Sequence, residues 1–411
     1  MSALLVGLGL LVAHPAFAEN ITVQGLLEEA MRRSPAVQAK RRAYEAARAR
    51  VFAAWLPEDP MFGVDAEGQP DLFKIGDRTD LEYMVSQTIP FPTTLILRGQ
   101  AALRDAQIAY QRYREAERET AWHMEQPYYE LYLTKKTLAA LEEVRALLEK
   151  LSGTAQARYE VNKGSQQDLL KANIELSKVN IELFNTKQEE HLAEAHISHL
   201  LDQSLATHYA LPDEPPAVPL ARSQEELEQL ALTARPELQA AALGIRRAKT
   251  SRLLAATSWL PDITGRIEAR QFNNGNSPER DTFIGVTVPV WSLLKGAGGG
   301  WKAADQDVKE AEATYLEMKN EVLLSVHEAY AKAKSAEHAL TVYEQFILPQ
   351  AKQQVEVALA SYEAGRSDFL DLIDAQRMLK DAQMAYYKFR ADHEVGLANL
   401  RLAVGDQLSD K

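Results

Sequence analysis

The chain has 411 residues, of which 46% are hydrophobic and 25% are charged, and it contains no cysteine. This composition predicts a large folded body and is too apolar for a disordered segment. The formal net charge of -12 argues against a nucleic-acid partner, because phosphates require a surface rich in Lys and Arg. The lack of cysteine excludes disulfides, thiolate metal sites and a catalytic cysteine.

The first eighteen residues, MSALLVGLGLLVAHPAFA, combine an apolar run with the small-residue sequence Ala16-Phe17-Ala18. This pattern predicts a secretory signal peptide over residues 1–18 and an exported mature chain. The alternative is a buried N-terminal helix. No other run reaches the ~18 apolar residues that a membrane-spanning helix needs. If the protein crosses a membrane, we expect it to do so with strands.

The sequence repeats itself about halfway along. YEVNKGSQQDLLKAN, from Tyr159, returns as YEAGRSDFLDLIDAQ from Tyr362. Further matches keep the same order: Trp55-Leu56-Pro57 with Trp259-Leu260-Pro261, Thr88-Ile89-Pro90 with Thr287-Val288-Pro289, and Asp202-Gln203 with Asp406-Gln407. We therefore predict a tandem duplication. The first repeat covers residues 19–210, a proline-rich linker covers 211–223, and the second repeat covers 224–411.

Each repeat is predicted to contain a helix, a strand hairpin, a long helix and a further helix. In the first repeat, helix-compatible stretches cover residues 22–55, 93–159 and 165–201. The middle helix would be roughly 100 Å long, and the other two laid end to end roughly 105 Å, so one long helix can pair with two shorter ones. The long helix of the second repeat is expected over residues 301–364. Apolar residues spaced three or four apart predict coiled-coil seams.

Between the first two helices of each repeat, the hydrophobic period changes to two, which predicts strands. The expected strands are MFGVDAE (61–67), LEYMVSQTIPF (81–91), DITGRIEARQ (262–271) and TFIGVTVPV (282–290). In the last strand, Ile284, Val286, Val288 and Val290 are expected on one side. One apolar face and one charged face are typical of a transmembrane barrel wall with a polar lumen. The alternative is a soluble sheet packed on helices.

Four strands cannot close a barrel, because an open edge in lipid leaves backbone groups unsatisfied at several kcal/mol each. Several chains must therefore share one barrel, and three copies give twelve strands. The predicted fold is mainly α-helical: a long coiled-coil helical tunnel, with four strands per chain that contribute to a 12-stranded transmembrane β-barrel in a trimer.

The twofold order of elements, together with YEAGRSDFLDLIDA at residues 362–375, resembles the TolC family of outer-membrane efflux channels. The resemblance covers essentially the whole mature chain. It implies a homotrimer in the cell outer membrane, in contact with outer-membrane lipid, whose helical tunnel extends into the periplasm. It also implies two protein partners, a periplasmic adaptor and an inner-membrane pump of the RND type. No cofactor is expected.

The resemblance places the two repeated turns at the periplasmic tip of the tunnel. Asp371 and Asp374 match the acidic positions that ring the entrance in this family. Asp168 matches an acidic residue that, in the closed state, bonds to the equivalent of Tyr362 and to a nearby Arg. The alternative for these three Asp residues is a helix-start role near the positive end of the helix dipole.

Here the turn departs from the family, because Ser367 occupies the Arg position and Arg366 precedes it. The surface that contacts the adaptor is expected to consist of Asn162, Lys163, Gly164, Ser165, Gly365 and Ser367.

Other apparent motifs do not predict chemistry. GAGGGWK at residues 296–302 lacks the spacing of a P-loop, and its glycines are interpreted as a turn from barrel wall to helix. His196 and His199 share a helix face but have no third ligand at a fixed spacing, so no metal site is expected. No nucleophile and base pair is present, so an enzyme is not expected.

The leading functional hypothesis is the passive exit duct of a tripartite efflux system. It would export metal ions or small toxic compounds delivered by an inner-membrane transporter through the adaptor. The alternatives are a type I protein secretion duct and a periplasmic coiled-coil scaffold without a pore. DPMFGV and GSQQDLLKANIELSK are similar to members that accompany heavy-metal pumps of the Cus and Czc type, which favours a metal cargo.

Overall fold

The computed structural model describes residues 22–67, 80–161, 165–210, 212, 214–215, 219–272, 277–364 and 366–405. The predicted signal peptide lies outside these residues. Within the described residues the chain packs as two units, one from the stretches 22–35, 117–228 and 325–405 and the other from 36–116 and 229–324. Two of the unit boundaries fall inside long helices, α3 (Pro92–Glu160) and α8 (Trp301–Val342). The repeat boundaries at 19–210 and 224–411 stay a prediction.

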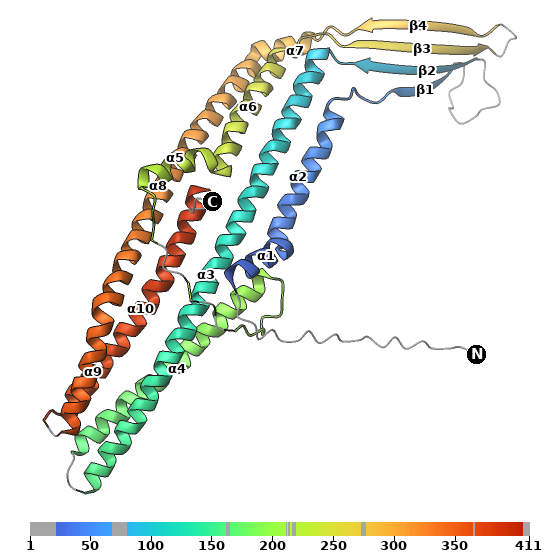
Figure 1. Ribbon diagram of the computed structural model, residues 1–411. Helices are drawn as coiled ribbons and strands as arrows, with labels where there is room; N and C mark the ends of the chain where they lie inside the picture. The colour runs from blue at the N-terminus through green and yellow to red at the C-terminus, as the bar shows by residue number, and fades with distance from the viewer. Residues whose placement is uncertain are drawn as a thin grey trace, which may run out of the picture. The chain divides into compact units, whose positions relative to one another are not determined.

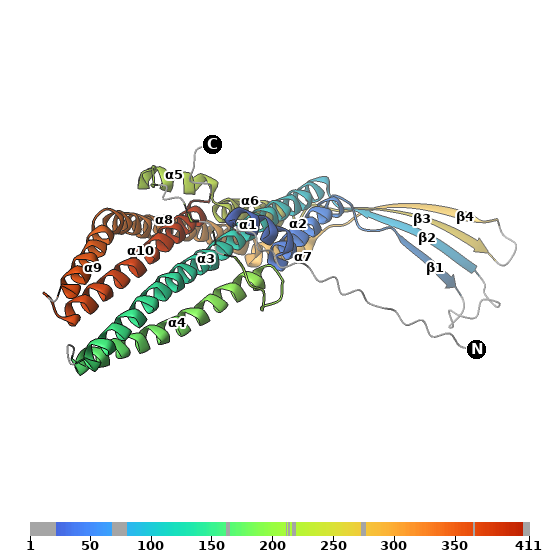
Figure 2. The same cartoon turned by 60° about the horizontal axis from the view of Figure 1, so that its bottom comes forward.

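The first unit consists of helices. The end of α3 forms a hairpin with α4 (Gln166–Leu200), and α9 (Leu348–Glu363) forms a second hairpin with α10 (Phe369–Val404), as Figures 1 and 2 show. The predicted helices over 93–159 and 165–201 are confirmed to within one residue at each end. No helix in the described part of the chain is long and apolar enough to span a bilayer.

Two predicted helices are interrupted at proline residues. The expected helix over 22–55 is broken at Ser34 into α1 (Val23–Arg33) and α2 (Pro35–Ala54), because a residue before proline is pushed out of the helical region. The expected helix over 301–364 contains a π-helical turn, η2 (Tyr343–Ile347), between α8 and α9. Pro349 follows this turn and has no N–H to donate, so regular helical bonding cannot continue there.

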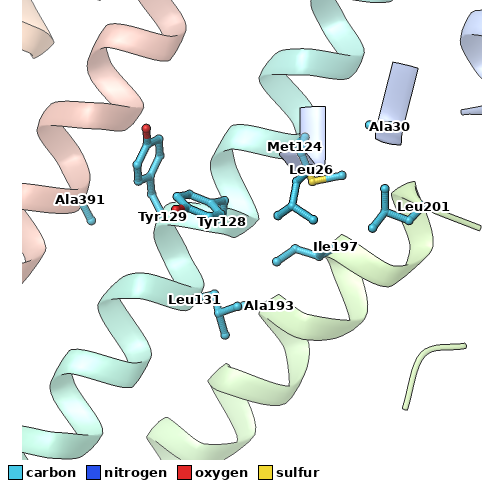
Figure 3. Packing of buried hydrophobic residues seen from close by; sticks show 10 residues of the cluster. All are labelled: Leu26, Ala30, Met124, Tyr128, Tyr129, Leu131, Ala193, Ile197, Leu201 and Ala391. Atoms are coloured by element: carbon cyan, nitrogen blue, oxygen red, sulfur yellow. The ribbon is translucent and has the colours of Figure 1, made fainter. Parts of the chain in front are cut away.

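A buried apolar cluster holds α1 against the first hairpin (Figure 3). Leu26 and Ala30 of α1 pack with side chains of α3, of α4 and its C-cap residue, and of α10, namely Met124, Tyr128, Tyr129, Leu131, Ala193, Ile197, Leu201 and Ala391. Burying a Leu, Ile or Met side chain completely stabilises the fold by about 1.5–3 kcal/mol. The short helix α1 is therefore held by tertiary packing, with the Thr22 hydroxyl accepting from the backbone N–H of Gly25 at its start.

The second unit carries the sheet, whose strands are β1 (Met61–Glu67), β2 (Asp80–Ile89), β3 (Ile263–Phe272) and β4 (Glu279–Val286). Their order is β1-β2-β3-β4, and all three pairings are antiparallel (Figure 1). Pairing of β2 with β3 joins strands that come from the two predicted repeats. The unit also contains α2, α6 (Pro236–Ala256), α7 (Val290–Lys295) and η1 (Gly296–Gly300), and α5 (Gln224–Ala234) crosses the unit boundary.

The four predicted strands are confirmed except at two C-terminal ends, because β2 ends at Ile89, before Pro90 and Phe91, and the last strand also ends early. Val288 and Val290 were expected to continue the strand, but β4 ends at Val286 and Val290 begins α7. The cause is Pro289, which lacks the N–H that a strand pairing needs and stands at the N-cap of α7. The glycines expected to form a turn lie in η1, where Gly299 has φ 135°, a conformation that favours glycine.

Candidate channel entrance and membrane-facing sheet

The ends of the two hairpins contain the residues that the sequence places at the tunnel entrance. Ser165 precedes α4, and its side chain accepts from the backbone N–H of Gln167 at 3.0 Å. In the other turn, the backbone N–H of Arg366 donates to the Ser361 carbonyl at 2.8 Å. Ser165 and Arg366 are exposed, and Ser367 is half-buried. Asn162, Lys163, Gly164 and Gly365 lie outside the described residues, so the adaptor surface stays a prediction.

Tyr362 lies in a core shared by the two hairpins. Its side chain is buried with Phe369 of α10 and with Leu148, Leu151 and Ala172 of the first hairpin. The Tyr362 and Phe369 ring centroids are 5.5 Å apart, and the Arg158 guanidinium stands 4.5 Å from the Tyr362 centroid. A cation over an aromatic face is attracted by the ring quadrupole. The cation that contacts Tyr362 is therefore Arg158, which the sequence analysis missed although it directly precedes the repeated Tyr159.

Asp168 is half-buried in the first turn of α4, and its backbone N–H donates to the Ser165 carbonyl at 3.2 Å. Within the described residues of this single chain, it makes no hydrogen bond to Tyr362 or Arg366. The contact between Asp168 and Tyr362 that the resemblance implies stays a prediction for the assembled channel. A position in the first turn, near the positive end of the helix dipole, is compatible with a helix-start role for Asp168. It is also compatible with a bond to Tyr362 in the closed state.

Asp371 and Asp374 are both exposed near the start of α10, three residues apart on one helix face. Their surroundings differ. Asp374 is 3.3 Å from Arg377 Nη1, which offsets part of its charge. Asp371 lies in the first turn of α10, and no ion pair to it is found among the described residues. Asp371 is therefore the carboxylate more available to an external cation.

Two ion pairs join the second hairpin to the first. Arg377 Nη2 is 2.8 Å from Glu175 Oε1, and Lys380 Nζ is 2.9 Å from both carboxylate oxygens of Glu182. Burial opposes ionisation of Glu175, but a hydrogen bond from Lys178 and the charge of Arg377 outweigh it, so its pKa lies below the ordinary 4.5. These two ion pairs were not predicted from the sequence. The sequence did contain a signal for the first pair. Arg377 and Glu175 are 202 positions apart, which is close to the offset between the two copies of the repeated turn, so they occupy nearly equivalent places in the two hairpins.

The sheet has one mainly apolar and one mainly charged face, although Arg280 pairs with Ala269 on the apolar side. Residues paired across antiparallel strands point to the same face, and the register gives the continuous row Phe62, Val85, Ile267 and Thr282. On this face Phe62 is 75%, Ile267 60% and Ile284 76% exposed. On the opposite face, Arg270 bonds to Glu82 at 2.8 Å and Arg266 to Glu268 at 2.6 Å. Exposed apolar side chains at this density predict contact with lipid or another chain.

Comparisons with known proteins agree with this geometry. Residues 227–406 match the family model of the outer membrane efflux protein. The chain is 28% identical to the cobalt-zinc-cadmium resistance protein CzcC of Cupriavidus metallidurans over 182 residues, which are 43% of this chain and 40% of CzcC. It is 30% identical to the outer membrane protein TolC of Vibrio cholerae over 200 residues, 44% of each chain. The matches thus span less than half the length of these curated relatives.

A solved structure has a similar fold over nearly the whole length of this chain. A crystal structure of CusC, from a study of folding and transmembrane channel formation, is similar with a TM-score of 0.79 and 16% identity. The similarity covers 93% of this chain and 92% of that one, and at this identity it shows the fold. The outer-membrane location predicted from the sequence agrees with the family description. The resemblance to the TolC family is confirmed over part of the chain, where residues 227–406 match the model of the outer membrane efflux protein.

Proposed function

We propose that the protein is the outer-membrane exit duct of a tripartite efflux system. The duct is passive, and an inner-membrane pump of the RND type supplies the energy through a periplasmic adaptor. One observation carries this proposal: the two repeats form a single four-stranded sheet whose apolar face is continuous across the β2–β3 pairing. Such a sheet matches the wall of a transmembrane barrel with a charged lumen face.

The sheet requires further copies of the chain. In the described sheet, β1 and β4 each have one neighbour, so each presents an edge of unpaired backbone groups. Such an edge is tolerated in lipid only when another strand pairs with it. Three chains would supply twelve strands and close the barrel. The same three chains would bring six helix hairpins to one tunnel entrance.

Assembly and conductance test this proposal together. The mature protein, purified in detergent, should have the mass of a trimer by light scattering with subtraction of the detergent. In a planar bilayer it should conduct ions, and dissociated chains should not. A monomer that stays soluble without detergent would exclude the channel and favour a periplasmic scaffold.

Metal cations are the proposed cargo. CzcC is named for cobalt, zinc and cadmium resistance, and the chain carries a net charge of -12. Clusters of carboxylates raise the local concentration of cations. Deleting the gene should therefore sensitise cells to Zn²⁺, Co²⁺ or Cd²⁺, and plasmid-borne protein should restore growth. Unchanged metal tolerance with loss of a secreted protein would favour type I secretion.

A further inference from the structure

A cluster of possible metal ligands lies at the C-terminal end of α4, away from the hairpin turn where α4 begins. His191 and Glu194 are three residues apart on α4, and His208 comes from the segment that follows the helix. Glu194 Oε2 is 2.8 Å from His208 Nδ1 and 3.5 Å from His191 Nδ1. One ligand atom from each of the three side chains lies within 4.8 Å of the others.

The Glu194 carboxylate is held in a fixed orientation. Its side chain is 3% exposed, and its Oε1 accepts from the backbone N–H of Tyr209 at 3.1 Å. Lys135 Nζ also approaches Oε1, at 3.8 Å, and is itself held by Glu190 at 2.7 Å. These contacts occupy Oε1 and leave Oε2 directed at both imidazoles. Outer contacts of this kind orient the ligands of protein metal sites.

The spacing and chemistry of the cluster suit a transition-metal ion. Ligand atoms about 2.1 Å from a tetrahedral ion lie roughly 3.4 Å from one another. Glu194 Oε2 is 2.8 Å from the His208 nitrogen and 3.5 Å from the His191 nitrogen, so the observed separations are close to this value. The side chains of His191 and His208 are 45% and 71% exposed, so both rings can turn toward an ion. Two imidazole nitrogens and one carboxylate oxygen form a ligand set that Zn²⁺ uses with a water in the fourth position.

We infer that His191, Glu194 and His208 bind one divalent transition-metal ion of the Zn²⁺ type in each chain. Since His208 follows α4 in the sequence, a bound ion clamps residues 201–210 onto the end of that helix. This segment leads into the predicted linker at 211–223, so the ion would restrain the connection between the two repeats. The site is separate from the proposed duct function and does not depend on it.

This assignment differs from the pair considered in the sequence. His196 and His199 are both exposed on α4, and neither belongs to a cluster of three metal-ligating side chains within the described residues. Helix spacing alone brought this pair to attention, and the sequence predicted no metal site there. His208 could not be placed from the sequence, because its approach to Glu194 depends on how the chain folds back after α4 ends.

Zn²⁺ binding to the full-length mature protein in detergent tests the inference. After chelator treatment, competition with a chromogenic zinc indicator should give one ion per chain. His191→Ala and His208→Ala should each weaken binding at least tenfold, whereas the control double variant His196→Ala/His199→Ala should bind as the parent does. These four histidines are exposed, so their replacement should leave the core intact. The buried Glu194 is left unchanged, because its replacement could disturb the fold.

Limited proteolysis gives a second measurement. Zn²⁺ should slow cleavage between residues 201 and 223 in the parent protein and leave the rate unchanged in His208→Ala. Absence of binding to the parent, or equal binding by the His191→Ala/His208→Ala double variant, would overturn the assignment. Trimer mass and conductance, measured on the same samples, keep this result distinct from a failure of the duct proposal.

Discussion

Arg377 of α10 and Glu175 of α4 form an ion pair at 2.8 Å that connects the two helix hairpins. The same guanidinium lies 3.3 Å from Asp374, so one cation links the acidic motif of the second repeat to a helix of the first. Lys380 and Glu182 form a second connection further along α10. These contacts are physical candidates for the interaction that keeps the hairpins together at a closed entrance.

Removing the first pair should open the entrance more than it destabilises the protein. Partly exposed ion pairs contribute about 0–1 kcal/mol each, so Arg377→Ala should leave the trimer intact. Such an energy nevertheless shifts a two-state opening equilibrium up to about fivefold, and single-channel conductance in planar bilayers should rise. Lys178→Ala is the matched control, because Lys178 contacts Glu175 only within α4. Equal conductance of Arg377→Ala and the parent would show that this pair does not restrain the entrance.

The pH dependence of opening follows from Glu175. Burial opposes its ionisation, but Lys178 and Arg377 hold its folded-state pKa below the ordinary 4.5. Because the pKa of Glu175 is lower in the folded state, the ion pair stabilises the closed hairpins fully at pH values above the ordinary pKa. This stabilisation is lost as the pH falls through the folded-state pKa. Conductance of the parent should therefore rise on acidification below pH 4.5. Glu175→Gln should have raised conductance already at pH 7 and a smaller acid-induced step. Identical pH profiles for the two proteins would contradict this assignment.

The aspartates at the start of α10 should bind blocking cations. In a trimer, Asp371 and Asp374 would supply six carboxylates around one axis, and such a ring attracts multivalent cations. A multivalent cation on the periplasmic side should block conductance, and the double variant Asp371→Asn/Asp374→Asn should not be blocked. Because Arg377 offsets Asp374, Asp371→Asn alone should remove more of the block than Asp374→Asn alone.

Asp168→Ala serves as the comparison for that experiment. If Asp168 holds Tyr362 in the assembled channel, this variant should conduct more and still be blocked by the cation. Block of the double Asn variant at the parent's cation concentration would identify the aspartates as ordinary helix-start residues.

The second hairpin turn should be essential for contact with the adaptor. If Gly365 takes the left-handed backbone conformation that its place in the repeated turn predicts, Gly365→Val should distort the turn, because that conformation penalises a β-branched side chain. Metal efflux should fall while the amount of trimer stays normal. Gly153→Val is the control, since an added Cβ at Gly153 of α3 meets nothing within 4 Å. Normal efflux by a stable Gly365→Val trimer would place the adaptor contact elsewhere.

The sequence alone determined the type and order of most of the helices and strands. Helix and strand periods are local, so the bounds of α3 and α4 were predictable to within one residue. The helix interruptions near Pro35 and Pro349 could also have been predicted from the local sequence, since proline lacks the N–H donor that a regular helix needs. The predicted helices 22–55 and 301–364 did not include them. The family resemblance depended on the same local order together with the repeated turn.

The tertiary structure decided which elements meet. Periodicity shows that a strand has an apolar face, but it does not say that β2 pairs with β3 or that Phe62, Val85 and Ile267 share one row. Likewise, the charges of Glu175 and Arg377 are visible in the sequence, but their 2.8 Å contact depends on how two hairpins pack. A local pattern fixes the chemistry that an element presents. Its partner is chosen by long-range packing, because many partners satisfy the same pattern and only the folded chain brings one of them within contact distance.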